Sequence, residues 1–133
     1  MSVTRLRALR YALVITGLIT IFGLFPLTRL WPSGWRWDPD NEMYLQMIMG
    51  IYATLGVFLI LAARDPEQHL SLIWFTVWSS VVHGAIMAVQ ALVYPMHRGH
   101  LLGDVPALFL IAIVLGVLTP RRSARPGPAG AGE

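Results

Sequence analysis

Four long apolar runs constrain the fold of this chain more than any other feature of its sequence. A transmembrane helix needs about 20 consecutive, mostly apolar residues. Four stretches meet that requirement, and they are residues 9–27, 43–63, 70–93 and 101–119. Because the bilayer core offers no water to backbone polar groups, each run is predicted to be a helix that crosses a membrane. The first run is longer than the apolar core of a signal peptide, so we expect it to be retained.

The composition excludes several classes of protein. The chain has 133 residues, of which 56% are hydrophobic and 13% are charged, whereas a soluble domain carries about 25% charged residues. High hydropathy likewise argues against a disordered chain. The absence of cysteine excludes disulfides, thiolate nucleophiles and cysteine-based metal sites. The sequence also lacks the phosphate-binding, zinc-protease, serine-hydrolase and dinucleotide motifs, so we assign no catalytic residue.

The connections and the arginines predict the topology. Short links between runs favour antiparallel neighbours, so we expect an all-α, integral membrane four-helix bundle of up-down-up-down topology over residues 1–119. With four helices, both termini lie on one side, and that side carries seven of the ten basic residues, which the positive-inside rule places in the cytoplasm. The seven are Arg5, Arg7, Arg10, Arg64, Arg121, Arg122 and Arg125, against Arg29, Arg36 and Arg98 on the other side. Residues 120–133 are rich in Pro, Gly and Ala, which predicts a disordered cytoplasmic tail.

Aromatic residues gather where the runs meet the outer connections. Trp31, Trp35 and Trp37 lie in the first connection, and Tyr44 and Tyr94 lie near the outer ends of the second and third runs. Trp and Tyr favour the headgroup level of a bilayer, so interfacial anchoring is the simplest interpretation. Stacking on a cofactor is the alternative.

Polar residues at membrane depth form a stripe on the third run. At 3.6 residues per turn, Thr76, Ser80, His83 and Gln90 share one face, and His83 lies near the middle of the bilayer. Lipid offers these groups no partners, so the face is expected to point into the bundle. It serves either interhelical hydrogen bonding or the binding of a ligand, proton or cofactor.

A second polar cluster is predicted at the outer mouth of the bundle. His97, His100 and Asp104 are spaced by three and four residues, and Glu42 with Gln46 at the start of the second run faces them from across the bundle. Two imidazoles and a carboxylate are weak candidates for a metal site. Alternatively, His100 pairs with Asp104, which is itself well placed at the N-terminal dipole of the fourth helix.

Residues 52–104 resemble a family of small bacterial four-helix integral membrane proteins of unknown function. The resemblance rests on Arg64-Asp65-Pro66, Ser79-Ser80-x-x-His83, Met87-Ala88-Val89-Gln90-Ala91 and Gly99-His100-Leu101-Leu102-Gly103-Asp104. It implies a multi-pass protein of a bacterial inner membrane, and it implies no activity. It also marks five residues for testing together, which are Ser80, His83, Gln90, His100 and Asp104.

Three functions fit these features, and the absence of catalytic motifs favours the first. It is a non-enzymatic accessory or ligand-binding helical bundle whose polar stripe on the third helix points inward. The second is a membrane redox or cofactor-binding component that uses His83 with the outer cluster of His100 and Asp104. The third is an oligomeric proton- or ion-linked transporter.

The expected partners follow from the same features. The lipid bilayer is one partner, and another membrane protein or a second copy of the chain is a candidate for a second. The basic residues cluster at the membrane edges, so no nucleic acid is expected. The sequence names no cofactor.

Overall fold

The structure, a computed structural model, describes residues 1–121. Every regular element within these residues is helical, so the all-α class is confirmed. Four helical stretches are long and apolar enough to cross a membrane, and they are residues 3–30, 42–62, 66–93 and 95–118. The predicted tail lies largely outside the described residues, which include only its first two positions.

The first stretch is longer than the sequence predicted. It comprises α1 (Val3–Leu18), the π-helical segment η1 (Ile19–Gly23) and α2 (Leu24–Leu30), in place of residues 9–27. Pro26 lies inside α2 rather than at the end of the helix. A proline has no N–H for the helical ladder and its ring crowds the preceding turn, and a π-helical turn just before it changes the hydrogen-bonding register. The helix therefore continues past the proline.

The α-helices of the second and third stretches begin and end within a residue of the predicted limits. α4 (Glu42–Ala62) starts where the side chain of Asn41 accepts a hydrogen bond from the backbone N–H of Tyr44. The 3₁₀ turn η2 (Pro66–His69) then leads into α5 (Leu70–Val93). Between the first two stretches lies the short helix α3 (Pro32–Trp35).

The fourth stretch departs from the prediction at its start. The 3₁₀ helix η3 (Pro95–Leu102) precedes α6 (Asp104–Leu118), so the α-helix begins at Asp104 and not at residue 101. The reason is contact with α3. A Cβ atom on Gly103 would collide with the backbone oxygen of Gly34, and one on Gly99 would collide with that of Ser33. Glycine at both positions allows the two short helices to meet backbone to backbone.

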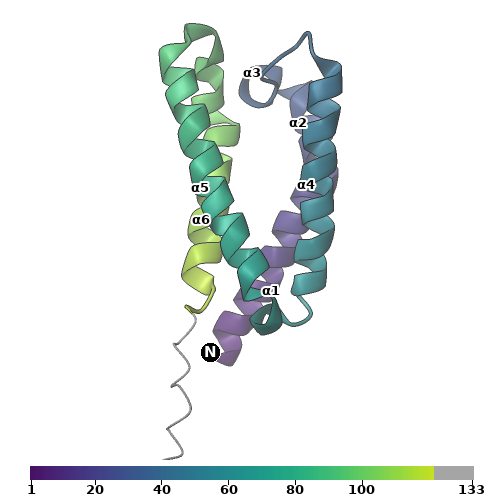
Figure 1. Ribbon diagram of the computed structural model, residues 1–133, viewed down its shortest axis with the longest axis vertical. Coiled ribbons are helices and arrows are strands. Elements are labelled where there is room, and N and C mark those ends of the chain that lie inside the picture. The colour runs from purple at the N-terminus through teal and green to yellow at the C-terminus, as the bar shows by residue number, and fades with distance from the viewer. Residues whose placement is uncertain (122–133) are drawn as a thin grey trace, which may run out of the picture.

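The four stretches form two pairs, which Figure 1 shows side by side. α1 packs against α4, and α5 packs against α6. The first pair is tightest where Gly17 faces Gly56, because a Cβ atom on Gly17 would lie 2.7 Å from the Gly56 carbonyl oxygen. Figure 1 also places the N-terminus, η2 and the last turn of α6 at one end, called here the η2 end, and α3 and η3 at the other, the α3–η3 end.

The main apolar core shared by the two pairs lies at the η2 end. Residues of all four long helices form one buried cluster there, which includes Leu13, Leu59, Ile73 and Leu115. Arg5 fastens the two pairs at the same end, since its guanidinium donates hydrogen bonds to the carbonyl oxygens of the last turn of α6. A basic side chain at a helix C-terminus satisfies carbonyls that have no partner within the helix.

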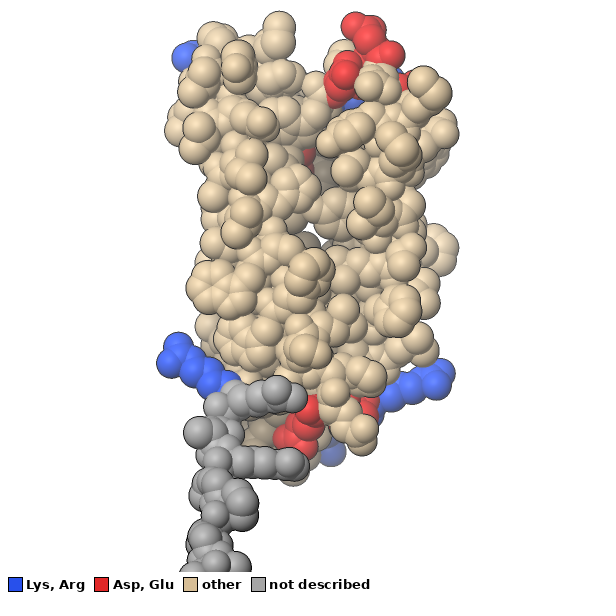
Figure 2. Space-filling view, viewed as in Figure 1, with Lys and Arg blue, Asp and Glu red and all other residues tan. Residues whose placement is uncertain are grey.

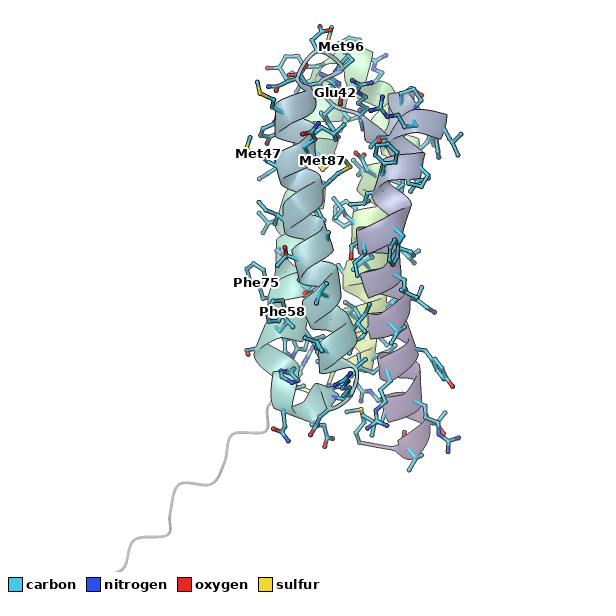
Figure 3. The ribbon with its side chains drawn as sticks, turned by 90° about the vertical axis from the view of Figure 1, so that its right-hand side faces the viewer. Glu42, Met47, Phe58, Phe75, Met87 and Met96 are labelled. Atoms are coloured by element: carbon cyan, nitrogen blue, oxygen red, sulfur yellow. The ribbon has the colours of Figure 1, made fainter. Side chains whose placement is uncertain are left out.

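The outer surface of the pairs is apolar between two charged ends. Figure 2 shows the Arg, Asp and Glu side chains at the top and bottom of the molecule and almost none on the surface between them. Met47, Phe58 and Phe75 point outward in Figure 3, and each is more than half exposed. So large a surface of exposed apolar side chains is unfavourable in water and suits a lipid environment.

Candidate functional site

A cavity of about 360 Å³ separates the two helix pairs in the half of the molecule near the α3–η3 end. Residues of all four helical stretches and of the segment between α3 and α4 line it. Most of the lining is apolar, and Met87 is directed into it from α5 (Figure 3). The space-filling view shows the corresponding hollow along the seam between the pairs (Figure 2). Pockets that bind small molecules have this size and character, with a few polar groups in an apolar wall.

One polar link crosses the cavity at mid-depth. The phenol oxygen of Tyr52 on α4 lies 2.5 Å from Nδ1 of His83 on α5. The two rings also lie nearly parallel, with centroids 6.0 Å apart. Within residues 1–121 this is the one side-chain hydrogen bond that joins α4 to α5. His83 therefore faces Tyr52 across the seam between the helix pairs, and both residues form part of the cavity wall.

A second polar group closes the cavity towards the α3–η3 end. Nε1 of Trp37 donates a hydrogen bond of 2.7 Å to Oδ2 of Asp104, the first residue of α6. Nδ1 of His100 lies 3.0 Å from the same oxygen. The Trp37 ring stacks on His100 at 4.1 Å between centroids and on His97 at 4.8 Å. The loop before α4 is thus held to the start of α6 by the hydrogen bond from Trp37 to Asp104, and to η3 by the stacking of Trp37 on His97 and His100.

The polar stripe predicted on α5 is divided between two environments. His83 and Gln90 line the cavity, although Gln90 is otherwise exposed. Thr76 and Ser80 are buried nearer the η2 end and do not line it. The hydroxyl of Thr76 donates to the carbonyl of Leu72 within its own helix. Only half of the stripe therefore contributes to the candidate site.

The predicted outer cluster is brought together only in part. His100 and Asp104 pair as the sequence alternative expected. Glu42 instead accepts a hydrogen bond of 2.7 Å from Arg36 and lies 3.6 Å from Arg29, and Gln46 is exposed on α4. Across residues 1–121, no three His, Asp or Glu side chains converge in a manner that would hold a metal ion. His97 stacks on Trp37 rather than joining a ligand set.

Two residues of the site were missed by sequence reasoning, and one of them left a signal. Tyr52 lies ten residues after the start of α4 at Glu42, and His83 lies ten residues before the end of α5 at Val93. Antiparallel neighbours bring such positions to the same depth, so the phenol and the imidazole could have been paired. Trp37 gave no such signal, because a tryptophan in an interfacial loop has an ordinary explanation as an anchor.

The arrangement can bind a molecule with an apolar body and a polar group. The wall supplies apolar contact surface, and the Tyr52–His83 pair and the Asp104 carboxylate supply polar contacts at two depths.

Comparison with known proteins adds one finding. A family described as of unknown function, DUF6632, matches residues 3–130 of the chain. No curated protein and no solved structure matches the chain.

Proposed function

The chain belongs to the family DUF6632, and because the function of that family is unknown, we propose one from the site: a multi-pass membrane protein that binds a small lipid-soluble molecule between its helix pairs. The observation that carries the proposal is the cavity of about 360 Å³, which is mainly apolar and is crossed by the Tyr52–His83 pair. A cavity at this depth in a bilayer is reached most readily by molecules that partition into lipid.

The proposed topology is a four-helix bundle of up-down-up-down order with both termini in the cytoplasm. Its support is the contact between Arg5 and the last turn of α6, together with the excess of arginine at the η2 end. The α3–η3 end and the cavity near it then lie on the outer side. A bacterial inner membrane is the proposed location, as the family resemblance in the sequence implies.

The test compares two alanines that are replaced by phenylalanine. Ala107 on α6 lines the cavity, so Ala107→Phe should fill it, whereas Ala85 on α5 is exposed and Ala85→Phe should leave it open. The probe is triphenylphosphine oxide, a neutral molecule with an apolar body and one polar oxygen. Equilibrium dialysis against detergent micelles with and without protein measures its binding.

Wild type and Ala85→Phe should bind about one equivalent of the probe saturably, and Ala107→Phe should bind none beyond the micelle background. Equal binding by all three proteins, or no saturable binding by any, would contradict the proposal. An absorption spectrum of the same wild-type sample tests the second function predicted from the sequence, since a redox cofactor would co-purify as a coloured species. The transporter interpretation stays a prediction, and no contact in the structure favours it.

A further inference from the structure

We propose that the cavity selects a lipid-soluble organic cation, such as an amine or quaternary ammonium group attached to an apolar body. This inference rests on the proposed function, because it names the class of molecule that the same cavity would hold. Three features carry it: the carboxylates on the wall, the pairing of the nearby arginines elsewhere, and the aromatic rings around the cavity.

The first feature is the charge of the lining. Asp104 and Asp38 both line the cavity, and no Lys or Arg among residues 1–121 does so. Asp104 is buried, with 8% of its surface exposed. A buried carboxylate in an apolar wall is costly unless a positive charge or several hydrogen bonds compensate it. A cation in the cavity would therefore stabilise Asp104, and an anion would be repelled by it.

The second feature is that the arginines closest to the cavity mouth are engaged elsewhere. Arg36 and Arg29 both pair with Glu42, and neither lies within ion-pair distance of an aspartate in the part of the chain that the structure describes. The one ionisable partner of Asp104 in those residues is His100, whose Nδ1 can donate to the carboxylate as a neutral ring. Within the described residues, no arginine therefore pairs with the Asp104 carboxylate beside the cavity.

The third feature is the aromatic content of the wall. Trp35, Trp37, Tyr44 and Tyr52 all line the cavity. The face of an aromatic ring attracts cations through its quadrupole, most strongly where water is excluded, and sites built from several rings recognise quaternary ammonium groups. Aromatic rings alone would also accept neutral molecules, so it is their combination with Asp104 that selects for positive charge.

The remaining wall determines the body of the ligand. Leucine, isoleucine and methionine side chains of η1, α2, α4, α5 and α6 make up most of the other lining. A small hydrophilic cation would leave these surfaces without contacts, whereas a cation with an apolar body would cover them. His83 also lines the cavity, and a neutral imidazole there is compatible with a cation.

The experiment ranks three probes of similar shape and different charge. Tetraphenylphosphonium is a cation, triphenylphosphine oxide is neutral, and tetraphenylborate is an anion. Equilibrium dialysis with the full chain in mild detergent at pH 8, where free histidine is uncharged, measures each dissociation constant. Binding is counted only where Ala107→Phe abolishes it, which removes probe that is dissolved in the micelle.

Tetraphenylphosphonium should bind at least tenfold more tightly than triphenylphosphine oxide, and tetraphenylborate should show no binding that Ala107→Phe abolishes. Asp104→Asn should lower the affinity for the cation about tenfold and leave the affinity for the neutral probe unchanged. Asp40→Asn is the matched control, since Asp40 lies in the segment between α3 and α4 and does not line the cavity, and it should change neither. Circular dichroism verifies that each variant keeps its helices.

The outcomes separate this inference from the function on which it rests. One contrary outcome is that the neutral and cationic probes bind the wild type with equal affinity and both fail to bind Ala107→Phe. That result would overturn the choice of a cation and leave the cavity as a binding site. If none of the three probes shows binding that Ala107→Phe abolishes, both this inference and the proposed function are overturned. If Asp104→Asn does not fold, the ranking of the three probes on the wild-type protein still decides.

Discussion

The two halves of this molecule use the same four helices in opposite ways. Near the η2 end, Leu13, Leu59, Ile73 and Leu115 from the four helices fill the space between the pairs and are completely buried. Near the α3–η3 end, the same helices leave a cavity of about 360 Å³. The contrast indicates that the first half holds the helices together and that the second half is available to bind a ligand.

The links between the pairs differ in the same way. At the η2 end, apolar contacts and the hydrogen bonds of Arg5 join them. Around the cavity, the Tyr52–His83 and Trp37–Asp104 contacts are the polar connections between opposite walls. Packing dominates the association of helices in lipid, and a single interhelical hydrogen bond contributes only about 0.6 kcal/mol on average. The half that holds the cavity should therefore be the less stable one.

The largest effect is expected from truncating one leucine of α4 in each half. Leu59→Ala removes a completely buried side chain at the η2 end and should lower the free energy of unfolding by about 2–5 kcal/mol. Leu45→Ala, on the cavity wall of the same helix, should cost less than about 1 kcal/mol, because its side chain already faces a void. Unfolding by SDS in mixed micelles, followed by circular dichroism, measures both. Similar costs would remove the distinction between the halves.

The second-largest effect on the free energy of unfolding is expected from enlarging one alanine of α6 in each half. Ala112 is buried in the packed half, so Ala112→Phe should be overpacked and cost about 1–3 kcal/mol. Ala107→Phe, one turn and a half away on the same helix, should be close to neutral because the cavity accommodates the ring. The same unfolding assay compares them, and a larger cost for Ala107→Phe would show that the cavity is not open.

A smaller effect is expected from the link at mid-depth. Tyr52→Phe keeps the ring and removes the hydroxyl that contacts His83, and it should cost about 0.6–1.7 kcal/mol. In a double-mutant cycle with His83→Ala, the second substitution should add less once the first has been made. Strict additivity would mean that the two side chains do not interact. Tyr11→Phe, at an exposed position of α1, is the control and should cost nothing measurable.

The smallest effect on stability is expected at the cavity mouth. Trp37→Phe preserves an aromatic ring over His100 and removes the N–H that binds Asp104. The contact of His100 with the carboxylate remains, so the cost should be about 0.5 kcal/mol, the low end for a hydrogen bond. Trp31→Phe in the same connection, where the ring is 42% exposed, is the control for loss of an indole. A cost above about 2 kcal/mol would show that the mouth is a packed core.

The helices could be predicted from the sequence because hydropathy and length alone identify such segments. Their ends were less predictable where tertiary contact decides them. The first run was predicted to end at residue 27, yet the π-helical turn before Pro26 allows α2 to continue to Leu30. The start of α6 was set by the contact of Gly103 with Gly34, a residue nearly 70 positions away, which no local pattern encodes.

The site was predictable only in part, because helical periodicity identifies a face and not the element that it meets. His83 was correctly singled out as an unusual residue within an apolar run, but its partner Tyr52 looked like an ordinary aromatic residue. Glu42 was expected near Asp104, and the nearby Arg36 engages it instead. Thr76 was expected to hydrogen-bond another helix or to contact a ligand, and its hydroxyl donates to its own backbone, as threonine in a helix commonly does.

The most direct measurement is the reactivity of single cysteines in the two halves. The chain has no cysteine of its own, so Ala107→Cys and Ala112→Cys each introduce one thiol on the same helix. A charged methanethiosulfonate reagent modifies only thiols that reach water. In membranes, Ala107→Cys should react with the reagent in the cavity and be protected by tetraphenylphosphonium, while Ala112→Cys should stay unreactive until the protein is unfolded. Equal rates at the two positions would contradict a binding cavity confined to one half.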